Sequence, residues 1–214
     1  MEFPTNKQLE ELEASIARRL SPSRMEHTRR VRDMALEIGG LLSLDFLPEL
    51  AAAALLHDAA KEESFEKQLH LAMKSATIES KCEAERYPAV LHSYAACGLI
   101  LEEYPDFATE RILDAVHFHT TGKADMSLFC ATLFLADYIE QGRVYEACIR
   151  MRELFFSKMK ADSPECRLQG FYETVYAVLY ETVTYLERKN RIVHPETYRA
   201  IEFYSVFCQD RKAL

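Results

Sequence analysis

Apolar and polar positions along this chain recur with the period of an α-helix. Between residues 5 and 19, Leu9, Leu12 and Ile16 lie among charged side chains at the spacing of one helix face. Residues 51–56 are apolar without a break, which is typical of a helix that is buried on all sides. No segment alternates apolar and polar residues as a half-buried strand would. The pattern therefore predicts an all-α fold.

Proline and capping residues set the expected ends of these helices. Ser21 followed by Pro22 has the form of an N-cap with proline at the first helical position. Ser127 is expected to cap another helix, and residues 75–87 are expected to form a polar loop. The predicted helices span residues 5–19, 22–39, 48–58, 64–74, 88–103, 106–118, 127–140, 144–159 and 165–189, and a last helix begins at Pro195.

The composition supports one helical domain. Six glycines and seven prolines among 214 residues are few, and apolar residues make up 49% of the chain, enough to build a core. Residues 161–164 indicate a turn rather than a linker between domains. We expect a single domain over residues 1–214, with its core at about 21–145 and the helices at 5–19 and 145–210 packed on that core.

The net charge of −8 limits the kinds of partner that we expect. Nucleic acids and anionic membranes select clustered Lys and Arg, so we expect neither as a partner. The six cysteines include no C-x-x-C pair and are expected to be reduced thiols. The charged amino-terminal helix is unlike a signal peptide, and no apolar stretch approaches the ~20 residues of a membrane span. These features favour a cytoplasmic protein.

The most informative residues are His57 and Asp58, which follow the apolar run. A buried imidazole beside a buried carboxylate is costly unless each has a partner, and one cation can satisfy both. Further candidate side chains for such a site are His27, His92, His119 and Asp137. Asp137 lies inside an apolar helical segment, and the presence of a carboxylate there favours a role as a metal ligand or in catalysis over a structural role. The sequence therefore predicts a metal-dependent phosphohydrolase.

The spacing of these residues leaves open how they meet. His27 and His57 lie on consecutive predicted helices, about fifteen residues before and about nine residues after the connecting loop. At ~1.5 Å per residue, this difference leaves an offset of roughly 9 Å, which a crossing angle or a longer loop would have to absorb. Adjacent residues of a helix point ~100° apart, so Asp58 either shares an ion with His57 or reaches a second ion alongside.

Five ordered segments carry a resemblance to a known family. They are Arg24–Thr28, Leu55–Lys61, Val90–His92, Phe118–Gly122 and Leu135–Arg143. In this order the segments resemble the HD-domain phosphohydrolases, and together they resemble the YqeK-type branch, the symmetric diadenosine tetraphosphate hydrolases. The resemblance spans roughly residues 21–200, and its most specific parts are His-Thr-Thr-Gly and Leu-Ala-Asp-Tyr-Ile-Glu.

The resemblance implies an all-helical HD-domain bundle with a C-terminal helical extension that binds iron, as one or two ions, with other divalent metals as alternatives. It also implies that a metal-bound hydroxide splits diadenosine tetraphosphate symmetrically into two ADP. The implied metal ligands are His27, His57, Asp58 and Asp137. The implied nucleotide contacts are His27, Lys61, Glu62, His92, His119, Asp137 and Arg143.

Elementary chemistry gives four of these residues a catalytic role. Arg143 follows a predicted helix end, where it can extend a guanidinium fork to phosphate oxygens. Lys61 lies one helical turn past the His-Asp pair, on the same rim of the expected site. His92 and His119 either donate protons to the leaving phosphate or bind a second metal ion. The expected catalytic residues are therefore His92, His119, Lys61 and Arg143.

Other readings of the chain stay open. Related HD-type enzymes act on other nucleotides, and a non-catalytic nucleotide-binding regulator would keep the same fold. A helical surface of this kind would also support a homodimer. The aromatic residues between Phe171 and Tyr185 are expected to pack in the core rather than stack on a base. His194 precedes Pro195 and is expected to cap the last helix, with contact to an adenine ring as the alternative.

Overall fold

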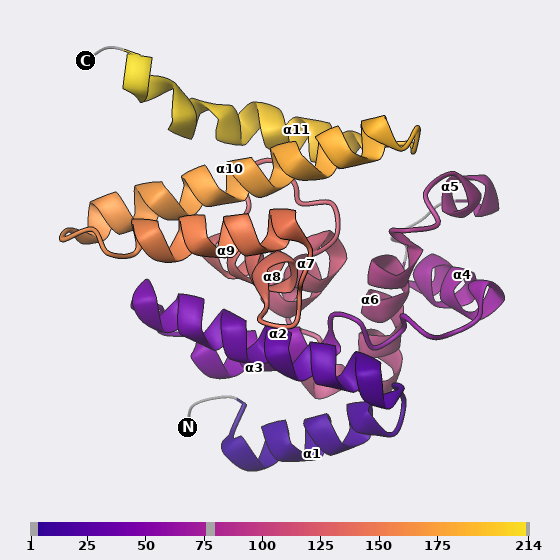
Figure 1. Cartoon of the computed structure of the whole chain (residues 1–214). Helices are drawn as coiled ribbons and strands as arrows, with labels where there is room; N and C mark the ends of the chain where they lie inside the picture. Colours follow the sequence, from indigo (N-terminus) through magenta and orange to yellow (C-terminus); the bar gives the residue numbers. More distant parts are fainter. Residues whose placement is uncertain (1–3, 76–79, 213–214) are drawn as a thin grey trace.

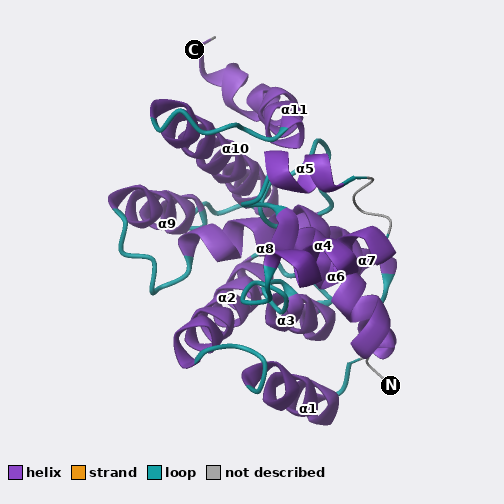
Figure 2. Ribbon diagram, turned by 90° about the vertical axis from the view of Figure 1, so that its right-hand side faces the viewer, coloured by secondary structure: helices purple, strands orange, loops and turns teal. Residues whose placement is uncertain are grey.

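The structure, a computed structural model, describes residues 4–75 and 80–212, with side chains as far as Cys208. Each regular element in these ranges is a helix, which confirms the predicted all-α fold (Figure 2). The first six helices are α1 (Asn6–Ala17), α2 (Pro22–Leu41), α3 (Leu47–Leu56), α4 (Phe65–Lys74), α5 (Lys81–Arg86) and α6 (Leu91–Glu103). They are followed by η1 (Pro105–Phe107), α7 (Glu110–Phe118), α8 (Leu128–Ile139), α9 (Glu146–Lys158), α10 (Pro164–Arg188), α11 (Pro195–Tyr204) and η2 (Ser205–Lys212).

Side-chain caps begin several of these helices where the sequence predicts them. The Ser21 hydroxyl accepts a hydrogen bond from the backbone N–H of Arg24, and the Ser127 hydroxyl accepts one from Cys130. Both predicted N-caps are therefore confirmed. A capping box has the same effect at α1. Each of these bonds satisfies an N–H group that the first turn of a helix leaves without a partner.

The helix α8 lies at the centre of the bundle (Figure 1). Residues 129–136 of this helix are all buried. The helices α2, α7 and α9 pack against α8, while α3 packs against α2 and α7, and α6 packs against α4 and α7. This arrangement brings the ends of α3 and α7 toward α2 and α8. Within the described ranges, none of the helices combines the length and the apolar character that crossing a membrane requires.

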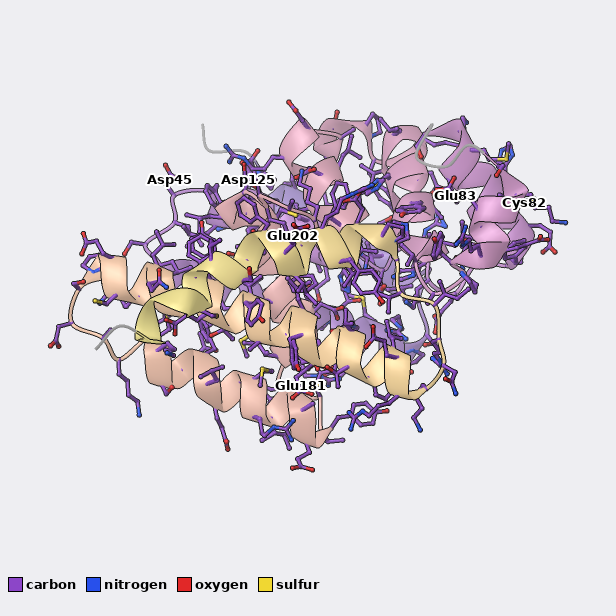
Figure 3. The ribbon with its side chains drawn as sticks, turned by 90° about the horizontal axis from the view of Figure 1, so that it is seen from above. Asp45, Cys82, Glu83, Asp125, Glu181 and Glu202 are labelled. Carbon is purple, nitrogen blue, oxygen red and sulfur yellow. The ribbon has the colours of Figure 1, made fainter. Side chains whose placement is uncertain are left out.

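The helices α9, α10 and α11, together with η2, form a C-terminal extension (residues 146–212) along one side of the bundle (Figure 1). Glu181 of α10 lies toward α9 (Figure 3), where it accepts a hydrogen bond from Arg150 at 2.9 Å. Tyr204 of α11 is fully buried, and its hydroxyl accepts a hydrogen bond from the backbone N–H of Met126 at 3.0 Å. The extension is therefore joined to the core through buried contacts.

The predicted loop at residues 75–87 is wrong in part, because it contains α5. The Ser80 hydroxyl accepts a hydrogen bond from the backbone N–H of Glu83, which caps this short helix. Ala84 is buried in a small apolar cluster with residues of α6, so the segment gains a packed face despite its polar composition. Residues 76–79 of the predicted loop lie outside the described residues.

Two predicted helix starts are also wrong by a few residues. The helix α6 begins at Leu91 rather than at Pro88, because the three residues from Pro88 form a turn. The helix α7 begins at Glu110 rather than at residue 106, because the short helix η1 precedes it and Thr109 provides the N-cap. Proline and aspartate favour a helix start, but α7 begins only where the Thr109 side chain caps it, and α6 begins after the turn at Val90 without a side-chain cap.

Candidate metal centre

The end of α3 presents His57 and Asp58 to the interior of the bundle. His57 is the C-cap of α3 and has no exposed surface, while Asp58 is 3% exposed. The Nδ1 atom of His57 lies 2.7 Å from the carbonyl oxygen of Ala54. A carbonyl can only accept, so Nδ1 carries the proton and the lone pair of the ring is on Nε2. The fold thereby fixes both the orientation and the tautomer of His57.

The end of α7 repeats this arrangement at His119. His119 is the buried C-cap of α7, and its Nδ1 atom donates to the carbonyl oxygen of Val116 at 2.7 Å. Its Nε2 atom lies 3.7 Å from Asp58 Oδ1. The Nε2 atom of His92, on α6, lies 3.3 Å from the same oxygen and 3.1 Å from His119 Nε2. One oxygen of Asp58 therefore faces two imidazoles.

The helices α2 and α8 bring a further histidine beside two carboxylates. His27 Nε2 lies 3.1 Å from Asp137 Oδ1 and 3.8 Å from Asp58 Oδ2, and His57 Nε2 lies 3.6 Å from this same Asp58 oxygen. On the other side of the His27 ring, Nδ1 lies 3.2 Å from Glu140 Oε1. A carboxylate that orients a histidine from behind is the usual outer partner of a metal ligand.

These residues, which we call the histidine–aspartate cluster, fit a divalent cation; they are His27, His57, Asp58, His92, His119 and Asp137. The Nε2 atom of His57 is buried and has no hydrogen-bond partner among the described residues, while the buried Nε2 atom of His27 faces the carboxylate of Asp137 at 3.1 Å. A buried nitrogen without a partner is costly, and a cation would satisfy that of His57 and replace the proton on His27. Three overlapping groups have ligand atoms within 4.8 Å of one another: His27 with His57 and Asp58, His57 with His119 and Asp137, and Asp58 with His92 and His119. Imidazole and carboxylate are donors that zinc and iron accept.

The structure closes the offset that sequence spacing leaves between His27 and His57. The helix α2 continues to Leu41 and α3 begins at Leu47, so His27 lies 14 residues before the end of α2 and His57 lies 10 residues after the first residue of α3. The remaining difference of four residues corresponds to roughly 6 Å along the helices. Packing of α2 against α3 absorbs it, and the two ring centroids lie 5.6 Å apart.

Burial and charge set the protonation of the cluster. Burial lowers the pKa of His57 and of His92 to about 4, despite the attraction of Asp58. Burial also opposes protonation of His27, but its carboxylate neighbours, Asp137 above all, outweigh this effect and raise its pKa to about 9. Although burial opposes ionisation of Asp58 and Asp137, the neighbouring histidines hold both carboxyl pKa values well below the usual value. Binding of a metal would therefore release a proton from His27.

Cationic side chains surround the cluster in this acidic chain. Arg24 and Arg143 donate hydrogen bonds to the carboxylates of the cluster, at 2.9 Å and 2.7 Å respectively. The Lys61 Nζ atom lies 3.0 Å from both ring nitrogens of His92, and burial lowers the pKa of this lysine. These three side chains concentrate positive charge around the cluster, as binding of a polyanion requires.

Glu62 lies outside the histidine–aspartate cluster. Its carboxylate accepts hydrogen bonds from the backbone N–H and from the hydroxyl of Ser21, each at 2.6 Å. Glu62 thereby connects the turn that carries His57 and Asp58 to the start of α2, which carries His27. Its predicted nucleotide contact stays a prediction.

Sequence reasoning missed several residues that contact the cluster, among them Glu140 and Arg24. Glu140 is 2% exposed, and it accepts a hydrogen bond from Arg30 at 2.8 Å besides its contact with His27. It follows Asp137 by three residues, which places the two carboxylates on neighbouring positions of one helical turn. Arg24 precedes His27 by three residues in the same way. This spacing is the signal in the sequence that would have identified both residues.

Metal-free protein is expected to lose stability as the pH falls from about 6.5 toward about 4. His57 and His92 have pKa values of about 4 in the folded chain, against 6.5 as model groups. In this window the unfolded chain binds protons that the folded chain does not, so each histidine is expected to lower the unfolding free energy at pH 5 by on the order of 2 kcal/mol. Urea denaturation of chelator-treated protein at pH 7 and at pH 5 measures this loss.

His27 changes the unfolding free energy with pH in the direction opposite to that of His57 and His92. Because its pKa is raised to about 9, its contribution is complete below pH 6.5 and is lost as the pH rises through 9. A His57→Gln variant is expected to lose less stability between pH 7 and pH 5 than the wild type. His70 is exposed, and a His70→Gln control should match the wild type. Equal urea midpoints for the wild type at the two pH values would contradict buried neutral histidines.

A Glu140→Gln variant is expected to bind metal more weakly by about 10- to 100-fold, because the outer partner of His27 loses its charge. Glutamine keeps the length of the side chain, and its oxygen can still accept the hydrogen bond from the backbone N–H of Gly142. Competition with a fluorescent chelator measures the metal affinity. Glu153 is an exposed acid on α9, so Glu153→Gln is the matched control. Equal affinities of the two variants would refute the positioning role of Glu140.

Comparison with known families places the cluster within one domain family. The HD domain family matches residues 24–142 of this chain, a range that includes every member of the histidine–aspartate cluster. The fold is also similar to that of a Clostridium acetobutylicum protein described as a predicted HD superfamily hydrolase involved in NAD metabolism. The two share 25% identity and a TM-score of 0.76, over 92% of this chain and 96% of the other.

Bacterial enzymes named symmetrical bis(5'-nucleosyl)-tetraphosphatase are similar to this chain over most of their length. The enzyme of Halalkalibacterium halodurans is 30% identical over 180 residues, which cover 83% of this chain and 87% of that enzyme. The enzyme of Bacillus subtilis is 28% identical over 192 residues, which cover 88% of this chain and 93% of that enzyme. The enzyme of Staphylococcus aureus is 24% identical over 187 residues, with 87% and 89% covered.

Proposed function

The chain belongs to the HD domain family, and from this premise we propose that it is a metal-dependent hydrolase that splits diadenosine tetraphosphate symmetrically into two ADP. Similarity to the symmetrical tetraphosphatases supports the substrate, because it extends over most of both chains. The observation that carries the metal dependence is the buried Nε2 atom of His57, which has no hydrogen-bond partner among the described residues and lies 3.6 Å from the carboxylate of Asp58.

We propose that His27, His57, Asp58 and Asp137 hold the cation and that the cation is iron. When bound, such an ion lowers the pKa of a coordinated water and takes up negative charge on phosphoryl oxygens. Imidazole nitrogens together with carboxylate oxygens suit iron, and they also suit zinc and manganese. Metal analysis of protein purified without added metal distinguishes these ions.

The cationic side chains at the cluster have the properties that binding of a polyphosphate requires. Arg24 and Arg143 keep about a third of their side chains exposed, at 31% and 33%, while each also donates to a carboxylate of the cluster. We propose that their remaining N–H groups bind phosphate oxygens in a forked geometry. Lys61 is mostly buried beside His92, where its ammonium would neutralise phosphate charge. Together these groups would orient the anhydride and balance the charge that develops as its P–O bond breaks.

We propose that Asp58, His92 and His119 hold a second ion. The two oxygens of Asp58 face different histidines, since Oδ2 lies nearer to His27 and His57 while Oδ1 lies nearer to His92 and His119. One carboxylate placed between two groups of ligands supports a site for two cations. The alternative is that His92 or His119 passes a proton to the leaving ADP, and the ion count of a His119 variant distinguishes the two roles.

The test of the proposed reaction is the product distribution from diadenosine tetraphosphate. Metal-loaded protein should yield ADP alone, and chelation should stop the reaction. A mixture of AMP and ATP would contradict symmetric cleavage. A higher kcat/KM for another nucleotide in a substrate panel would assign the chain to a different HD-type phosphohydrolase. Tight nucleotide binding without turnover, in protein shown to hold metal, would instead identify a non-catalytic regulator.

We also propose that the protein acts in the cytoplasm, as one domain over the whole chain. Free thiols at several positions support a reducing compartment; they are Cys82, Cys97, Cys130, Cys148 and Cys166. The expected homodimer, and the expected lack of nucleic-acid and membrane partners, stay predictions.

A further inference from the structure

A cavity of about 790 Å³ opens beside the histidine–aspartate cluster. Two of its lining residues contact the cluster directly. The Thr120 hydroxyl lies 3.1 Å from His119 Nε2, and Arg143 donates to Asp137. The opposite walls come from the turn before α6 and from the α10–α11 turn, which lie near each other at one edge of the molecule (Figure 1 and Figure 2). The volume is in the range of sites that enclose small organic ligands, about 300–1,000 Å³.

Much of this cavity is built outside the HD match. The match ends at residue 142, whereas Tyr185, Ile192 and His194 belong to the C-terminal extension and line the cavity. Tyr87 faces them from the turn before α6. The core and the C-terminal extension therefore form the cavity together. The core supplies the histidine–aspartate cluster, and the extension supplies a second wall at a distance from the cluster.

His194 presents an aromatic ring whose polar atoms are already engaged. Its Nδ1 atom accepts a hydrogen bond from the backbone N–H of Glu196, which confirms the predicted cap of α11. Its Nε2 atom lies 3.2 Å from the Tyr94 hydroxyl, and the ring of Tyr87 packs against it with centroids 4.5 Å apart. Burial lowers the pKa of His194, so the ring is neutral at neutral pH. A ring held in this way can offer its flat face to a ligand without any change of conformation.

Other lining residues are apolar yet exposed to solvent. Tyr185 is 47% exposed and Ile192 is 61% exposed. The prediction that the aromatic residues from Phe171 to Tyr185 pack in the core is confirmed for Phe171 and is wrong for Tyr180, which is exposed, and for Tyr185, which lines the cavity. Large apolar side chains that remain exposed around a concave site are typical of ligand binding rather than of core packing.

The charge of the cavity is opposite to that of the whole chain. Three arginines line it, namely Arg86, Arg143 and Arg191, against one acidic residue, Glu85. Among the described residues, neither Arg86 nor Arg191 forms an ion pair, so both charges are available to a ligand. The combination of aromatic rings and guanidinium groups suits a flat heterocycle attached to phosphates.

We propose that this cavity binds one nucleoside of the substrate, with the base against His194 and Tyr185 and the phosphates directed past Arg143 to the cluster. The inference rests on the proposed function, because a polyphosphate chain would connect the cavity to the metal centre. It assigns to the C-terminal extension the recognition of a nucleoside, a task separate from the metal chemistry of the core. The second nucleoside of the substrate lies outside this cavity.

The test compares binding of ADP and of pyrophosphate to metal-loaded protein by calorimetry. A Tyr185→Ala variant and a His194→Asn variant should each weaken ADP binding by about tenfold, because base–aromatic stacking is lost, while pyrophosphate binding stays unchanged. Asparagine at position 194 retains an N-cap for α11, so the change removes the ring rather than the helix start. Tyr180 lies on the same helix and is 57% exposed, and it does not line this cavity, so Tyr180→Ala is the matched control.

Each outcome decides the assignment. Selective loss of ADP affinity in the two variants, with no change in Tyr180→Ala, supports a nucleoside site. Unchanged ADP affinity would place the nucleoside elsewhere, and an equal loss for ADP and pyrophosphate would show that the variants disturb the phosphate site; either result overturns the proposal. Binding of ADP and of pyrophosphate is measured without turnover. Failure of the wild type to hydrolyse diadenosine tetraphosphate would therefore refute the proposed function, while the binding data would still decide whether the cavity is a nucleoside site.

Discussion

An Asp58→Asn variant is expected to lose both its bound metal and its activity. The two oxygens of Asp58 face the two pairs of histidines, with Oδ2 3.6 Å from His57 and Oδ1 3.3 Å from His92. Asparagine has the same shape, but it carries no charge and keeps a single oxygen. We expect kcat/KM for ADP release to fall by about 1000-fold or more, which corresponds to about 4 kcal/mol of lost transition-state stabilisation. Metal content and ADP release are measured on the same preparation.

Asp114→Asn is the matched control for this variant. Asp114 is a partly buried aspartate on α7 that forms an ion pair with Lys123 at 2.6 Å, and it is not among the groups that could hold a metal ion. The control makes the same chemical change and should keep both metal and activity. If Asp58→Asn retained its metal and more than about a tenth of the wild-type rate, Asp58 would not be a shared ligand, and the account of the cluster would be wrong.

A His119→Gln variant is expected to bind one ion rather than two and to lose about 100- to 10,000-fold in kcat. The Nε2 atom of His119 faces Asp58 Oδ1 and His92, and glutamine cannot supply a nitrogen lone pair there. Metal analysis by mass spectrometry gives the number of ions per chain, and steady-state kinetics give the rate.

His117→Gln is the matched control, because His117 lies two residues earlier and packs against the ring of Tyr94, with centroids 4.6 Å apart. The control should keep two ions and the wild-type rate. A wild type with one ion, combined with a slow His119→Gln variant, would favour proton transfer by His119 over a second metal site. An unchanged ion count together with an unchanged rate would exclude both roles.

The helices and their caps could be predicted because the determinants are local. The Ser21 and Ser127 hydroxyls cap helices by accepting hydrogen bonds from N–H groups three residues later, and such short-range caps can be predicted from the sequence. The same holds for His57 and Asp58, whose position at the end of an apolar helix made them candidates. Local spacing does not predict α5, because this helix depends on a tertiary contact, the burial of Ala84 against α6.

The meeting of His27 with His57 could not be predicted from spacing, because it depends on how α2 packs against α3. The three-residue spacing from Asp137 points to Glu140 as a candidate, but its contact with His27 joins residues 113 positions apart and depends on how α2 packs against α8. The role of Tyr185 was also hidden, because an aromatic residue at helical spacing has the same pattern whether it packs in a core or lines a cavity.

The structure reveals a device that appears twice in the cluster. His57 and His119 each follow the last residue of a helix, and each donates from Nδ1 to the carbonyl oxygen three residues earlier, at 2.7 Å. A terminal turn of a helix leaves such carbonyls without intrahelical partners. The helix end therefore gains a hydrogen bond while it fixes the imidazole lone pair toward the centre, which explains how two separate helices deliver the same tautomer to one site.

The central claim is that residues from α2, from the end of α3 and from α8 bind one cation together. Anomalous diffraction at the iron absorption edge, on crystals of protein purified with its native metal, tests this claim most directly. We expect an anomalous peak in contact with His27, His57, Asp58 and Asp137. A peak at another place, in protein that carries at least one ion per chain, would contradict it.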